Sequence, residues 1–167
     1  FGNSVGSFPF AAALTASAAP GKTVINAEIH ALPGSTYQCP PVPDLETMKR
    51  HVLVPLARGV KGFLFWQYRP ETLGVESPAW GLTNLEGGPT PWLLDASRIC
   101  TALQEHAPLV MRATPTPARV AIVNGTRNQI FDWCADGTIA HHHRSVEGAY
   151  VALYDRGLCA DVVSTEF

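Results

Sequence analysis

The chain has 167 residues, of which 46% are hydrophobic and 16% are charged, and its net charge is −2. This balance favours a folded domain with a buried core over a disordered chain. There is no long basic run, and no apolar stretch approaches the roughly 20 residues of a membrane span, so nucleic acid and membranes are poor candidates as partners. A complete eight-stranded α/β barrel needs about 250 residues and does not fit this length.

The cysteines are far apart and form no CxxC pair, so a zinc site built from them is not expected. We interpret them as free thiols in a reducing, cytoplasmic compartment. The sequence begins at Phe1 without Met or a signal-like segment, and it stops at Phe167 after a strand-like run. These ends suggest a piece of a longer protein. The cysteines are Cys39, Cys100, Cys134 and Cys159.

The first third of the chain predicts a helix, a strand and a second helix. Residues 10–19 are small and apolar and are followed by Pro-Gly, which predicts a short helix. Residues 23–28 predict a buried strand that ends in Glu28, and the proline-rich residues 31–43 predict a long loop. Asp44 is suited to cap the next helix, which Pro55 should kink or end early.

A second apolar run predicts a second buried strand. Residues 62–67 begin with Gly and end in a Trp-Gln-Tyr-Arg cluster, which is typical of a parallel strand whose carboxyl end is polar. Residues 72–91 are rich in glycine and proline and predict a long loop. The apolar spacing after Trp92 predicts a helix with Ala96, Ile99 and Leu103 on one face.

The last third predicts the start of an open parallel sheet. Residues 114–117 read Thr-Pro-Thr-Pro and indicate a stiff linker, which we place as the domain boundary. Residues 119–123 predict a strand, and Ser145 is expected to cap a helix that Gly157 ends. Residues 161–164 predict the next strand, so the order is that of an α/β sheet.

Two strands that bring Glu28 and the cluster from Trp66 to Arg69 to one rim suggest a carbohydrate-cleaving site. Retaining glycosidases use paired carboxyl groups, and aromatic faces suit sugar rings. Arg69 could orient a carboxylate, and Glu76 in the glycine-rich loop could accept hydrogen bonds from sugar hydroxyls. The structural alternatives are that Glu28 caps a loop or pairs with an arginine and that Trp66 fills the rim. Arg69 would then form a structural ion pair, and Glu76 would be a solvated side chain.

Other polar residues are less suited to chemistry. Adjacent histidines cannot all face one ion, so we expect residues 141–143 to form a solvated loop and not a metal site. Asp132 and Asp136 are interpreted as surface-loop residues without a partner. Residues 124–126 are too short a match to a phosphate-binding loop, and no organic cofactor or metal is implied.

These stretches together resemble glycoside hydrolase family 42, the β-galactosidases. Residues 59–69 (GVKGFLFWQYR) resemble the last barrel strand of that family, and residues 74–76 (GVE) resemble the loop that follows it. Residues 21–28 (GKTVINAE) resemble the strand that carries the nucleophile. Residues 119–123 and 157–163 resemble the start of the second domain, which is flavodoxin-like and mediates trimerisation in the family. The resemblance covers nearly the whole chain.

The resemblance implies an α/β architecture in which residues 1–113 form the C-terminal strands and helices of a (β/α)8 TIM barrel. Residues 114–167 would begin a flavodoxin-like, glutamine-amidotransferase-like domain. It implies Glu28 as the nucleophile and Trp66, Arg69, Glu76 and, as the nearest aromatic match, Tyr37 as substrate-binding residues. Two departures stand out: Ala79 occupies a position where family members often have His, and the family's aromatic residue after the nucleophile strand has no clean match. The larger gap is the acid/base, because the chain has no Asn-Glu pair that could supply it.

The sequence therefore predicts a fragment of a retaining β-galactosidase, a hydrolase of carbohydrate metabolism that acts on terminal β-D-galactosides and assembles as a trimer. The acid/base glutamate and the first six strands would lie outside this chain, which alone should be inactive. The alternative is a non-catalytic α/β module for oligomerisation or sugar binding, which would fold compactly from these residues alone.

Overall fold

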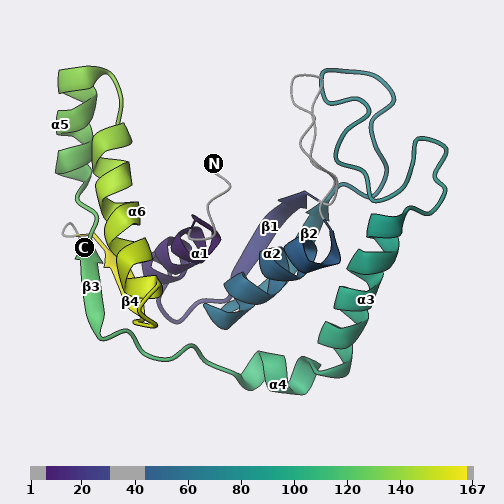
Figure 1. The fold of residues 1–167 in the computed structure, drawn as a ribbon, viewed down its shortest axis with the longest axis horizontal. Coiled ribbons are helices and arrows are strands. Elements are labelled where there is room, and N and C mark those ends of the chain that lie inside the picture. Colours follow the sequence, from purple (N-terminus) through teal and green to yellow (C-terminus); the bar gives the residue numbers. More distant parts are fainter. Residues whose placement is uncertain (1–6, 31–43, 165–167) are drawn as a thin grey trace. The chain divides into compact units, whose positions relative to one another are not determined.

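The computed structural model describes residues 7–30 and 44–164, and these fall into two compact units. One unit lies within residues 25–113, and the other combines residues 7–24 with residues 114–164. Each holds a two-stranded sheet with helices, so the expected α/β class is confirmed (Figure 1).

The 25–113 unit contains a sheet of β1 and β2 together with helices α2, α3 and α4. The strands β1 (Val24–His30) and β2 (Val60–Trp66) are neighbours, and their arrows point the same way in Figure 1. The helices are α2 (Leu45–Ala57), α3 (Pro91–Glu105) and α4 (Ala107–Arg112). The predicted strands and the predicted helices in this unit are therefore present, whereas α4 was not predicted.

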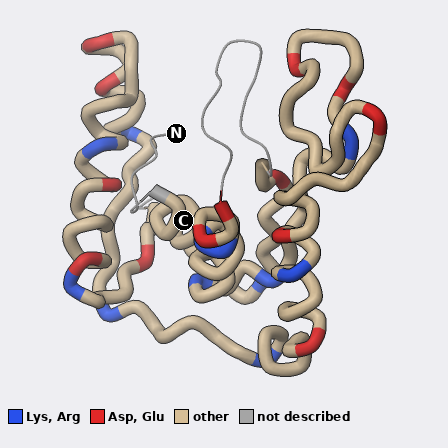
Figure 2. The backbone as a smooth tube through the Cα atoms, turned by 45° about the vertical axis from the view of Figure 1, so that its right-hand side comes forward, with Lys and Arg blue, Asp and Glu red and all other residues tan. Residues whose placement is uncertain are grey.

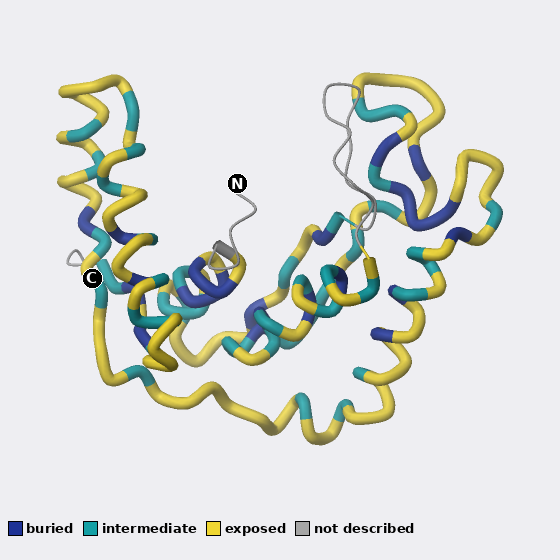
Figure 3. The backbone as a smooth tube through the Cα atoms, viewed as in Figure 1, coloured by how far each residue is buried: buried dark blue, intermediate teal, exposed yellow. Residues whose placement is uncertain are grey.

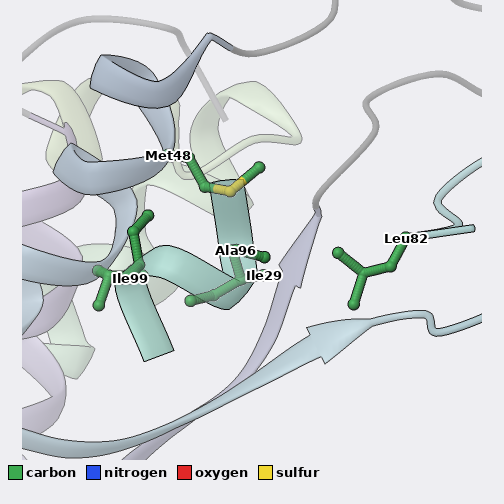
Figure 4. Packing of buried hydrophobic residues seen from close by; sticks show 6 residues of the cluster. Ile29, Met48, Leu82, Ala96 and Ile99 are labelled. Carbon is green, nitrogen blue, oxygen red and sulfur yellow. The ribbon is translucent and has the colours of Figure 1, made fainter. Parts of the chain in front are cut away.

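The core of this unit forms between the strands and two helices (Figure 4). Met48 and Val52 of α2 are almost fully buried, and Ala96 and Ile99 of α3 pack in the same cluster, as their helical spacing predicted. Ile29 contributes from β1. Because Ile29 is buried between two exposed or half-buried neighbours, the end of β1 has one face on the core and one face outward.

Helix ends in this unit are fixed by side chains. The Asp44 carboxylate accepts a hydrogen bond from Thr47 N at 2.7 Å, which confirms Asp44 as the cap of α2. The helix continues past Pro55 to Ala57. At the far end of the unit, the Lys61 ammonium donates to the carbonyl oxygens of Val110 and Ala113 at 2.6 and 2.5 Å, and it thereby closes the C-terminus of α4.

The second unit has a parallel sheet of β3 (Val120–Val123) and β4 (Ala160–Val163), in which Val120 aligns with Ala160. The parallel order predicted from the sequence is confirmed. The connection contains two helices, α5 (Thr126–Asp136) and α6 (Ala140–Tyr154). The N-terminal helix α1 (Ser7–Ala18) belongs to this unit, because Phe10 and Ala13 pack against Val146, Tyr150 and Val162.

Two predictions for this unit are wrong. The helix expected to start at Ser145 begins at Ala140, so residues 141–143 are helical and do not form a loop. Asp132 and Asp136 lie in α5, which was not predicted, and both have partners. The Asp132 carboxylate accepts from His142 N at 2.6 Å, and Asp136 lies 3.7 Å from the ring of His141.

The edge of β4 is covered by α1. The backbone N–H of Val162 donates to the hydroxyl oxygen of Ser17 at 3.0 Å, although these residues are far apart in the chain. A strand edge with unpaired N–H groups can recruit other chains, so this contact protects β4 from edge-to-edge association. Figure 3 shows that buried segments in α1 and near β4 contrast with largely exposed helix surfaces.

Candidate active site

Glu28 lies at the carboxyl end of β1 with its side chain 58% exposed. Its Oε1 is 2.6 Å from Nε2 of His30, the last residue of the strand. Its backbone N–H donates to Asn26 Oδ1 at 3.3 Å. The carboxylate is therefore more than half exposed and has an imidazole within hydrogen-bond distance.

The His30 ring stacks on the Trp80 ring, with centroids 4.0 Å apart and the planes inclined by 36°. Trp80 belongs to the loop that follows β2, and its carbonyl oxygen accepts from Gln67 N at 2.8 Å. The end of β1 is thus connected to the loop after β2 through an aromatic contact.

On α2, burial lowers the pKa of the His51 imidazole, and the positive charges of Arg50 and His30 act in the same direction.

After the carboxyl end of β2, the chain forms backbone hydrogen bonds with the later part of the loop that follows it. Leu82 N donates to Gln67 O at 2.7 Å, and Thr83 N donates to Tyr68 O at 2.9 Å. The Trp66 side chain is 41% exposed at this end of the strand, and its peptide bond to Gln67 is cis. Within residues 7–30 and 44–164, the buried Nε2 of Gln67 has no hydrogen-bond partner.

Arg69 is exposed and binds the loop. Its Nε and Nη2 donate to the carbonyl oxygen of Leu85 at 3.1 and 2.7 Å, so the guanidinium bridges the two ends of the loop. Glu76 is half-buried in the middle of this loop, and its carbonyl oxygen accepts from Ala79 N at 2.7 Å. Ala79 itself is buried.

A close backbone approach fixes the part of the loop that carries Trp80. Gly81 is buried, and a Cβ atom placed on it would lie 2.2 Å from Pro70 Cγ and 2.7 Å from Pro70 N. The indole N–H of Trp92 donates to the Gly81 carbonyl oxygen at 2.7 Å, and the Thr90 hydroxyl donates to Leu82 O. Only glycine fits this contact, and the first turn of α3 supports it.

The structure brings Glu28 next to His30, and His30 next to Trp80; neither residue was predicted to have a role. The signal for His30 was its position two residues after Glu28 on a strand, which puts both side chains on one face. Tyr37 lies outside the described residues. In the part of the chain that the structure describes, no group of three or more His, Cys, Asp or Glu side chains could hold a metal ion.

Three further properties concern the charges, the helices and the cysteines of the described residues. Acidic and basic residues are interspersed along both units in Figure 2. None of the helices in the described ranges is both long and apolar enough to cross a membrane. Cys100, Cys134 and Cys159 are unbridged, and burial raises the pKa of the Cys100 thiol.

At the carboxyl end of β3, in contrast to Glu28, the polar residues hydrogen-bond to one another. Asn124 Oδ1 lies 2.9 Å from Nε2 of His142 and accepts from Nε2 of Gln129 at 3.0 Å. Asn124 N also donates to Val163 O at 2.8 Å. These groups bind one another across β3, α5, α6 and the end of β4, so the cluster is a structural network.

Three solved structures share the fold of the chain. A cold-adapted β-galactosidase from Rahnella sp. R3 matches 98% of it with a TM-score of 0.74, and a β-galactosidase from Bacillus circulans sp. alkalophilus matches 99% with a TM-score of 0.84. A polyextremophilic β-galactosidase from the Antarctic haloarchaeon Halorubrum lacusprofundi matches 98% with a TM-score of 0.72. What they share with the chain is the fold. No family profile and no curated protein matches.

Each match has 19% sequence identity to the chain, which spans about a quarter of those proteins (25%, 25% and 24% of their lengths). The chain therefore has the fold of one quarter of a β-galactosidase. The resemblance predicted from the sequence is confirmed at this level.

Proposed function

We propose that this chain is the part of a retaining β-galactosidase that carries the nucleophile, Glu28. The observation that carries the proposal is the fold match with β-galactosidases over 98–99% of the chain. The exposed position of the Glu28 carboxylate at the end of β1 supports its role, because a nucleophile must reach the substrate.

In this proposal, a Glu28 oxygen attacks the anomeric carbon as the bond to the aglycone oxygen breaks. A second carboxylic acid, contributed by residues outside this chain, donates its proton to the leaving oxygen. The same group then takes a proton from water, which attacks the anomeric carbon and releases Glu28. Trp66 would stack on the sugar, and Glu76, Arg69 and Tyr37 would contact its hydroxyl groups.

The architecture proposed with this function has two parts. Residues 1–113 would contribute the last strands of a TIM barrel, and residues 114–167 would begin a flavodoxin-like domain that assembles three copies. A cytoplasmic location is part of the same proposal. Because α1 packs against the sheet of β3 and β4, a helix from residues 1–113 would also stabilise the part formed by residues 114–167.

The test is Glu28→Gln in the intact enzyme with a nitrophenyl β-galactoside. Removing a covalent nucleophile should lower kcat by at least about 1,000-fold, since nucleophilic attack supplies a large share of the total rate enhancement. Glu105→Gln, at the exposed end of α3, serves as the matched control and should keep normal turnover. Normal hydrolysis by Glu28→Gln would contradict the proposal and favour a non-catalytic module.

A further inference from the structure

We propose that His30 is a positioning residue that holds the Glu28 carboxylate for attack, and that the Trp80 ring holds His30 in place. The inference rests on the proposed function, because it assigns a task to groups that touch the proposed nucleophile. It concerns three side chains of the 25–113 unit whose contacts are described above.

The carboxylate is held through one oxygen. Nε2 of His30 lies 2.6 Å from Oε1 of Glu28, within hydrogen-bond distance. Among the described residues, no hydrogen bond to Oε2 is present. The geometry therefore leaves Oε2 as the oxygen that attacks, while the bond to Oε1 restricts rotation of the carboxylate.

The two side chains meet because of the strand. Residues two apart on a strand project from the same face, and the intervening Ile29 is anchored in the core with 3% exposure. The spacing between Glu28 and His30 is thus set by a buried residue. A carboxylate held on this rigid element loses little entropy when the substrate binds.

The imidazole is in turn held from the loop after β2. Its ring lies 4.0 Å from the Trp80 ring, and the backbone of Trp80 is fixed by the hydrogen bond from Gln67 N. The tight contact between Gly81 and Pro70 fixes the next residue. The loop would therefore set the orientation of the nucleophile without contacting it.

The experiment compares two substitutions in the intact enzyme. His30→Gln keeps an N–H donor at a similar reach, whereas His30→Leu keeps volume but has no donor. We expect His30→Leu to lower kcat about 10–100-fold with KM changed less than about 3-fold, because a hydrogen bond to a charged group is lost. His30→Gln should retain kcat within about 5-fold. His106→Leu, at an exposed position after α3, is the control and should behave as the unmodified enzyme.

Trp80 is tested in the same assay and by covalent trapping. Trp80→Phe should keep trapping of Glu28 by a 2-deoxy-2-fluorogalactoside near the normal rate, whereas Trp80→Leu should slow it about 5–10-fold through loss of the aromatic contact. Equal kcat values for His30→Leu and the control, or equal losses in His30→Leu and His30→Gln, would overturn the inference. Failure of the proposed function is distinguished by Glu28→Gln: if that variant is active, Glu28 is not the nucleophile whatever His30 does.

Discussion

The two sheets differ in how their strand ends are used. At the end of β1, the Glu28 carboxylate is exposed, and its hydrogen bond within the described residues is to His30. At the end of β3, Asn124 is bound by Gln129, by His142 and by the carbonyl oxygen of Val163. Glu28 lies near the carboxyl end of β1 and Asn124 directly follows β3, and α/β proteins commonly build sites at such strand ends.

The difference shows that a polar residue after a strand is a candidate for function only if its polar atoms are available. The side-chain oxygen and the backbone N–H of Asn124 are engaged in hydrogen bonds that connect elements of its own unit. Within the described residues, Oε2 of Glu28 has no hydrogen bond. Substitutions near each of the two strand ends test this contrast.

The largest effect is expected for Gly81→Ala, which attacks the loop that supports the exposed strand end. The new Cβ would lie within 2.2–2.7 Å of Pro70, including its backbone nitrogen, so the loop must move. Overpacking of this kind costs about 1–3 kcal/mol. Urea unfolding of the intact protein should show this loss, and kcat should fall as Trp80 shifts.

A second glycine provides the control. Gly148 lies inside α6, and a Cβ there would have no atom within 4 Å, so Gly148→Ala should stabilise by about 0.5–1 kcal/mol. If both variants had the same unfolding midpoint, the close approach at Gly81 would not constrain the loop.

Asn124→Ala tests the other strand end and should have the next largest effect. It leaves Gln129 and His142 without their shared acceptor, which for these partly buried groups should cost about 0.5–1.5 kcal/mol. Turnover per folded molecule should not change. The exposed Asn128→Ala on α5 should be near neutral, and a loss of activity in Asn124→Ala at full folding would show that this cluster is functional.

The sequence allowed prediction of the elements whose signals are local. Both strands of the first sheet were found because long apolar runs end in polar residues. The start of α2 was recognisable from its cap, Asp44, and α3 was recognisable from its apolar spacing. Glu28 was found from its position at the end of an apolar run and from the family resemblance.

Elements whose signals come from distant residues were missed. Helix α5 begins after Gly125 and α6 after Ile139, and neither has a side-chain cap from that residue. The His142 N–H near the start of α6 is instead bound by Asp132 of α5. His30 was not singled out, although it lies two residues after Glu28 on one strand; its ring contact with Trp80, fifty residues away, is visible only in the structure.

The smallest effect is expected at the local cap of α2, and it depends on pH. Hydrogen bonds from Thr47, first from its backbone N–H, lower the pKa of Asp44 below its ordinary value of 3.8. A carboxyl group with a lowered pKa in the folded state stabilises the protein above pH 3.8, and this contribution is lost as the pH falls through the folded value. Asp44→Ala should therefore have a lower Tm at pH 6, and its difference from the unmodified protein should shrink near pH 3.

Asp44→Asn separates the cap from the charge, because asparagine caps a helix but does not titrate. Its Tm should stay close to that of the unmodified protein at pH 6, and the unmodified protein should lose stability relative to it on acidification. A Tm difference between Asp44→Ala and the unmodified protein that is constant from pH 6 to pH 3 would mean that the charged form of Asp44 adds nothing.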